Sequence, residues 1–134
     1  MKERTYLLGA GNTLFVEHSA IGVGLGAAPV ALRNRFEYFP LDYQPPHFAM
    51  LTAAMEVGVV GGIFYLFLLI APAVMFMFRW RTIIDRPHML APFALLLALF
   101  VVGLFDYYTW SYAPGRLWQW LGWGLFSAGL REMA

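Results

Sequence analysis

The chain has 134 residues, of which 60% are hydrophobic, 18% are aromatic and only 13% are charged. Soluble domains carry about a quarter charged residues, so this composition favours a membrane protein. The formal net charge of +1 gives no basic nucleic-acid surface, and the lack of cysteine excludes disulfides and thiolate metal sites.

The first 52 residues are mixed in polarity and contain a glycine-rich stretch, "GVGLG" at 22–26. Because glycine disfavours regular helix and permits turns, this region is not expected to span a membrane. We expect a short interfacial helix near 3–16, a glycine-rich turn, a second helix near 27–37, and an extended, proline-bounded segment up to His47.

The next stretch, 57–78, holds 22 residues without a charge. At 1.5 Å per residue, a helix of this length crosses a hydrocarbon core of about 30 Å. The sequence therefore predicts a first membrane span at about 54–78. Pro72 lies inside it and predicts a kink, since proline removes a backbone hydrogen bond.

A short polar link follows, which contains three arginines, Arg79, Arg81 and Arg86, and a single acidic residue, Asp85. Positive residues concentrate on the cytoplasmic side of membrane proteins, so we expect this link to be cytoplasmic. Residues 1–52 would then lie on the outer side.

Two further apolar runs complete the chain. Residues 89–105 are uncharged and predict a second span, and 117–130 predict a third, at about 115–130, if Arg116 extends to the interface. Between them, the aromatic stretch "DYYTWSYAPG" suits an interfacial belt.

These elements predict an all-α integral membrane bundle. About three transmembrane helices occupy residues 53–134, and residues 1–52 form an extracytoplasmic region with short helices.

His47 is unusual at the edge of a predicted span. If Pro46 is the first helical residue, His47 stands in the first turn, where the positive helix end disfavours an imidazolium. A neutral imidazole there can accept a proton. The alternative is an amphipathic side chain at a wet boundary, without a chemical role.

The helical stripe that follows His47 contains small residues at Ala54, Gly58 and Gly61. Small residues on one stripe allow another helix to approach closely, so we expect a tightly packed helix pair there. Glu56 is expected to face roughly the opposite side from His47.

Three pieces of the chain resemble the C-terminal part of the O-antigen ligase and polymerase-like membrane protein family. These are "H-F-x9-G-V-V-G" from His47 to Gly61, "HSAIGVGLG" at 18–26, and the "F-D-x-x-x-W" segment within 103–125. They occur in the family's order. Two residues depart from its pattern: Phe48 replaces an amide or hydroxyl residue, and His18 replaces a proline.

The resemblance implies glycan transfer from a polyprenyl-diphosphate carrier to a hydroxyl acceptor, such as lipid A–core sugar or another glycan, outside the bacterial inner membrane. It implies no metal and no cofactor. Carried over by position, His47 is the candidate catalytic base and Arg4 a candidate diphosphate ligand. Arg33 and Arg35 are further diphosphate candidates, and Asp106 is a possible supporting residue.

Family members cross the membrane more often than this chain, so the resemblance implies a missing N-terminal membrane half as a partner. The alternative hypothesis is a non-catalytic membrane subunit or pseudo-ligase that acts by helix packing with a partner. The sequence leaves open ligation or polymerisation, and the identities of sugar and acceptor.

Overall fold

A computed structural model describes residues 2–39 and 42–132, and every regular element among them is helical. The helices are α1 (Lys2–Glu17), α2 (Ala28–Arg35), α3 (Ala49–Ile84), α4 (Pro87–Phe105), α5 (Tyr108–Ser111) and α6 (Ala113–Arg131). The expected all-α class is thus confirmed, and α1 and α2 lie where short helices near 3–16 and 27–37 were predicted.

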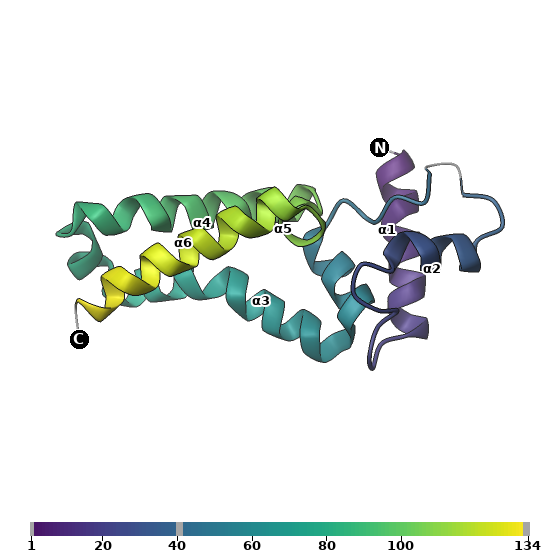
Figure 1. The fold of residues 1–134 in the computed structure, drawn as a ribbon, viewed down its shortest axis with the longest axis horizontal. Coiled ribbons are helices and arrows are strands. Elements are labelled where there is room, and N and C mark those ends of the chain that lie inside the picture. The colour runs from purple at the N-terminus through teal and green to yellow at the C-terminus, as the bar shows by residue number, and fades with distance from the viewer. Residues whose placement is uncertain (1, 40–41, 133–134) are drawn as a thin grey trace.

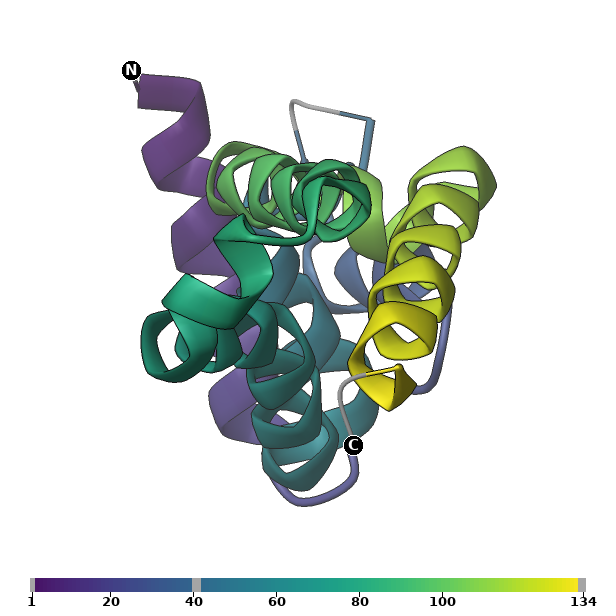
Figure 2. The same ribbon diagram turned by 90° about the vertical axis from the view of Figure 1, so that its left-hand side faces the viewer.

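The long helices α3, α4 and α6 form an elongated bundle, and α4 packs against both of the others (Figure 1). Helix α1 lies across one end of this bundle, with α2 beside it, while the α3–α4 turn and the end of α6 lie at the other end (Figure 1). Figure 2, viewed along the bundle, shows α4 above α3, with α6 to the right of both. The two ends of the bundle are therefore formed by different elements.

Two described helices, α3 and α4, are long and apolar enough to cross a membrane. Only 22% and 28% of their most apolar windows are buried within the chain, so most of this apolar surface is exposed. The buried core helix of a soluble protein would show the opposite. The predicted spans at 54–78 and 89–105 fall in these helices, whereas α6 does not meet the same criterion.

Helix α3 extends beyond its predicted bounds, since it begins at Ala49 and includes Arg79 and Arg81 of the expected polar link. Its backbone departs from helical geometry at Gly58 and Arg79. Neither departure lies at Pro72, and the kink expected there stays a prediction. The break occurs at a glycine because Gly58 adopts φ 74° and ψ −179°, which side-chain-bearing residues rarely reach.

Helices α4 and α6 form a closely packed pair that the sequence did not predict. Gly115, Gly122 and Gly129 recur at seven-residue intervals on the buried side of α6. A β-carbon at Gly122 would lie 3.0 Å from Leu96, and one at Gly129 would lie 2.9 Å from Met89. Small residues thus bring the backbones together, as in membrane helix pairs.

A separate hydrophobic cluster fixes the N-terminal region to the start of α3. Leu7 and Leu14 of α1 and Leu32 of α2 pack around Met55, and all four side chains are buried. This cluster holds α1 and α2 against the end of the bundle where His47 lies.

Candidate functional site

His47 lies just before α3 rather than within its first turn. The helix begins at Ala49 with Phe48 as its N-cap, and the carbonyl of Pro46 accepts hydrogen bonds from the Phe48 N–H and the Thr52 hydroxyl. The prediction that Pro46 opens the helix is therefore wrong, because its carbonyl is used to cap the turn. His47 is half-buried, at the edge of the first helical residues.

Two neighbours of the His47 imidazole come from the segment after α4. Its Nδ1 lies 3.7 Å from Oδ1 of Asp106, and its ring centroid lies 5.0 Å from that of Tyr107. A carboxylate on this side favours the tautomer with hydrogen on Nδ1. The Nε2 atom is then the one that can accept a proton.

Tyr107 remains protonated over a wide pH range. Burial, together with a hydrogen bond from its hydroxyl to Tyr112 and the negative charge of Asp106, raises the pKa of Tyr107 to about 12. Its ring also stacks on that of Tyr112, with centroids 5.7 Å apart. Tyr107 therefore places an uncharged phenol ring beside the His47 imidazole at neutral pH.

Arg4 of α1 also contacts His47 and the end of α4. Its Nη2 donates hydrogen bonds to the carbonyl of Leu104 at 3.0 Å and to that of His47 at 3.4 Å, and its guanidinium lies over the Phe105 ring. The contacts place a positive charge at the negative C-terminal end of α4. A guanidinium has five N–H donors, so Arg4 keeps others for a ligand.

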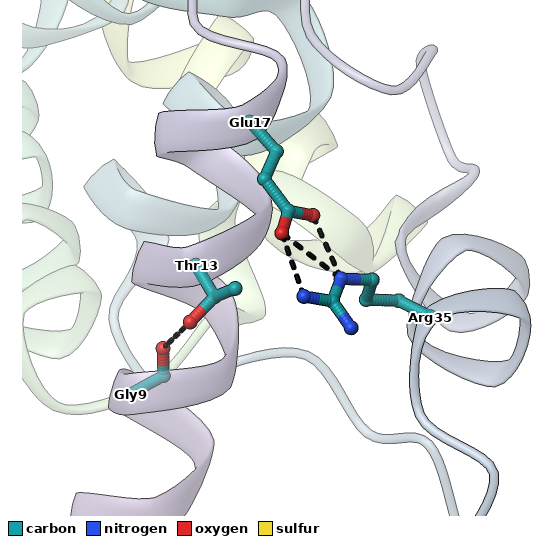
Figure 3. Close-up of polar contacts among 4 residues, drawn as sticks. All are labelled: Gly9, Thr13, Glu17 and Arg35. Carbon is teal, nitrogen blue, oxygen red and sulfur yellow. Dashed lines mark hydrogen bonds and ion pairs between the residues drawn. The ribbon is translucent and has the colours of Figure 1, made fainter.

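The other two predicted diphosphate ligands lie elsewhere. Arg35 of α2 forms an ion pair with Glu17 at the end of α1, with Nη2 and Oε1 2.8 Å apart (Figure 3). Its hydrogen bonds lower the pKa of Glu17. Arg33 is exposed and makes no ion pair with another described residue. The structure therefore brings together Arg4, His47 and Asp106, but not Arg33 or Arg35.

Glu56 is a buried acid that the sequence analysis set aside. Its carboxylate accepts hydrogen bonds from the backbone N–H groups of Gly26 (2.9 Å) and Ala28 (3.2 Å) and from the indole of Trp110 (2.8 Å). It connects the glycine turn, α2 and α5. An acidic residue within an apolar run is the sequence signal for such a contact, since buried carboxylates require donors.

The glycine turn inserts into the break of α3. The N–H groups of Val23 and Gly24 donate to the carbonyls of Met55 and Glu56, and the Val59 N–H donates to the Ser19 carbonyl. A β-carbon at Gly58 would collide with the backbone of Ala20. The small residue at Gly58 therefore admits a loop, and the predicted helix partner at this stripe is wrong.

The motif glycines and the motif histidine thus belong to one assembly at one end of the bundle. The arrangement offers an imidazole oriented by a carboxylate, beside a guanidinium with unused donors. Such a set can accept a proton from a hydroxyl and stabilise an anionic leaving group.

No protein-family model, curated protein or solved structure matches this chain.

Proposed function

We propose that this chain is the C-terminal portion of a membrane glycosyltransferase of the O-antigen ligase or polymerase type. It would transfer a glycan from a polyprenyl-diphosphate carrier to a hydroxyl acceptor. One observation carries the proposal: Arg4 and Asp106, which are 102 residues apart in the sequence, both contact His47. Arg4 donates to the His47 backbone carbonyl, and Asp106 lies beside the imidazole.

The proposed reaction uses His47 as general base. Its Nε2 removes the proton from the acceptor hydroxyl, and the oxygen attacks the anomeric carbon of the carrier-linked sugar. The bond between that carbon and the diphosphate oxygen breaks, and the polyprenyl diphosphate leaves. Asp106 stabilises the imidazolium formed at His47, in the manner of the acid in a catalytic triad.

Arg4 is the proposed ligand of the diphosphate. A guanidinium fork matches phosphate oxygens, and its charge stabilises the negative charge that develops on the leaving group. The bonds from Arg4 to the carbonyls of His47 and Leu104 hold it beside the base.

We propose a multi-pass topology in the bacterial inner membrane, with α6 as a third span and residues 1–52 outside. The location of the charged residues supports this orientation. Arg79, Arg81 and Arg86 lie near the α3–α4 turn, at the bundle end opposite His47 (Figure 1). Helix α1, which crosses the bundle end, would lie along the outer membrane surface.

The test is reconstitution of the chain in liposomes, alone and with the proposed N-terminal membrane half, together with a polyprenyl-diphosphate-linked glycan and an acceptor. His47→Ala should reduce transfer by about 10²- to 10⁴-fold, the contribution expected of a general base. Arg4→Lys should retain more transfer than Arg4→Gln, because lysine keeps the charge but loses the fork.

The matched control is His88→Ala, which removes an exposed histidine at the opposite end, where it lies 3.5 Å from Glu132. It should leave transfer unchanged. Equal transfer by His47→Ala and the unaltered chain would remove the histidine mechanism. No transfer under any condition would instead favour the non-catalytic subunit hypothesis.

A further inference from the structure

A cavity of about 430 Å³ lies between the glycine turn, α3 and the start of α6. Its polar lining includes Glu56, Ser111 and Arg116, and Pro29 and Pro45 form part of its apolar wall. Arg4, His47 and Asp106 do not line it. The cavity is therefore distinct from the candidate catalytic cluster.

The charge of Glu56 is already compensated within the protein. Its two carboxylate oxygens accept three N–H donors, two from the glycine turn and α2 and one from Trp110. Those donors are consequently not available to a ligand. The polar capacity that remains in the cavity belongs chiefly to Arg116 and Ser111.

Arg116 has no counter-ion among residues 2–39 and 42–132. Neither an ion pair nor a side-chain hydrogen bond joins its guanidinium to another residue of that set. It also stands in the first turn of α6, where the helix dipole is positive and a cation is disfavoured. Its side chain is exposed at the cavity mouth, as is that of Ser111, so both are accessible to a ligand. An anion there would supply the missing counter-charge.

The position of Arg116 along α6 matches the border of the apolar surface. Leu117, Trp118 and Leu121 follow it immediately and are all exposed. An arginine at such a border extends its charge to the level of lipid head groups. A guanidinium at this level can pair with phosphate oxygens through charge-assisted hydrogen bonds.

We propose that this cavity binds a phosphate ester or diphosphate through the Arg116 guanidinium and the Ser111 hydroxyl. The shared chemistry is the phosphoryl group, carried either by a lipid head group or by a soluble compound. The inference goes beyond the proposed transfer, because no reacting atom lies in this cavity. It would hold even if His47 were not catalytic.

The experiment uses the full chain in phosphatidylcholine nanodiscs. The readout is the NMR resonance of the Trp110 indole N–H, assigned by its loss in Trp110→Phe. Inorganic pyrophosphate is titrated in one arm, and phosphatidic acid is added to the nanodisc in the other. We expect a saturable shift that Arg116→Gln weakens about tenfold or more, as expected for loss of a charge-assisted contact.

The matched control is Arg131→Gln at the other end of α6, which should bind like the unaltered chain. A response to pyrophosphate supports a soluble source, and a response to phosphatidic acid alone supports a lipid source. No shift with either probe, or equal weakening by Arg116→Gln and Arg131→Gln, would overturn the proposal.

Two measurements distinguish a lost phosphate contact from misfolding of the variant. Without probe, the Trp110 resonance of Arg116→Gln should keep its position, because its bond to Glu56 does not involve Arg116. Ser111→Ala, which removes only a hydroxyl, should weaken binding several-fold; unchanged binding by this variant would contradict the assigned contact. Failure of phosphate binding would leave the glycan transfer assay unaffected, so the two proposals fail separately.

Discussion

At the scale of single residues, His47 is defined by neighbours that the chain supplies from both of its halves. Asp106 lies at ion-pair distance on the Nδ1 side, and Arg4 bonds to the His47 backbone carbonyl. An ordinary interfacial histidine needs neither contact. The pairing of an oriented imidazole with a guanidinium is what makes a chemical role testable.

Tyr107 gives a pH prediction. Its pKa is raised from 10.0 to about 12, so the folded protein holds this proton more tightly than the unfolded chain. The stabilising contribution is complete below pH 10 and is lost as the pH rises through 12. In Tyr107→Phe, the decline of unfolding free energy over this range should become shallower, measured by denaturation in detergent micelles.

The tyrosinate absorbance provides the accompanying observation. The unaltered chain should show a component that titrates near pH 12, and Tyr107→Phe should lack it. A titration curve that is identical in the two proteins would contradict the raised pKa.

Gly58 carries a second residue-scale prediction. Its backbone, at φ 74° and ψ −179°, lies in a region essentially restricted to glycine, and a β-carbon there would meet the Ala20 carbonyl. Gly58→Ala should lower the free energy of unfolding by about 1–3 kcal/mol, measured in micelles.

The control for this change is Gly124→Ala in α6. No atom lies within 4 Å of a β-carbon there, and the residue is helical and exposed. We expect a gain of about 0.5–1 kcal/mol, because alanine forms helix better than glycine. Equal effects of the two substitutions would show that the Gly58 break has no conformational requirement.

At the scale of elements, α6 is less apolar than α3 and α4, yet it packs in the same bundle. Its buried side is a glycine stripe that packs against α4, while its other side exposes Trp118 and Trp120. Contact between backbones, and not the length of an apolar run, fixes its position.

The α4–α6 contact predicts a large difference between two neighbouring glycines. Gly122→Val should destabilise the protein by about 1–3 kcal/mol, because its β-carbon would press on Leu96 at 3.0 Å. Gly124→Val, on the open side, should change stability by less than about 1 kcal/mol. Thermal unfolding in micelles measures both, and similar losses would contradict this packing.

At the scale of the whole molecule, the two ends of the bundle differ in chemistry. One end holds α1, α2 and the proposed site, and the other holds Arg79, Arg81 and Arg86 (Figure 1). The proposed orientation follows from this separation, since positive residues remain on the cytoplasmic side.

The absence of cysteine allows a direct test of this orientation in cells. Single cysteines replace exposed residues at either end, Asn34→Cys in α2 and Thr82→Cys near the end of α3. A membrane-impermeant maleimide should label Asn34→Cys in intact cells, and Thr82→Cys only after permeabilisation. The reverse pattern would contradict the proposed topology.

The sequence by itself determined the helical class, the two long apolar helices, and the approximate positions of α1 and α2. These features depend on local composition and periodicity, which any window of the chain reveals. The helix start expected at Pro46 was wrong, because the Pro46 carbonyl accepts hydrogen bonds in the turn that precedes Ala49. The kink expected at Pro72 stays a prediction.

Only the tertiary structure decided which distant residues meet. Arg4 and Asp106 approach His47, the glycine turn packs at Gly58, and backbone donors surround Glu56. The hydrogen bonds in these contacts join residues from 28 to 100 positions apart in the sequence. No periodicity encodes such pairs, since they arise when packed helices bring their ends together. The chain thus specified its elements locally, while packing selected the residues that form its candidate sites.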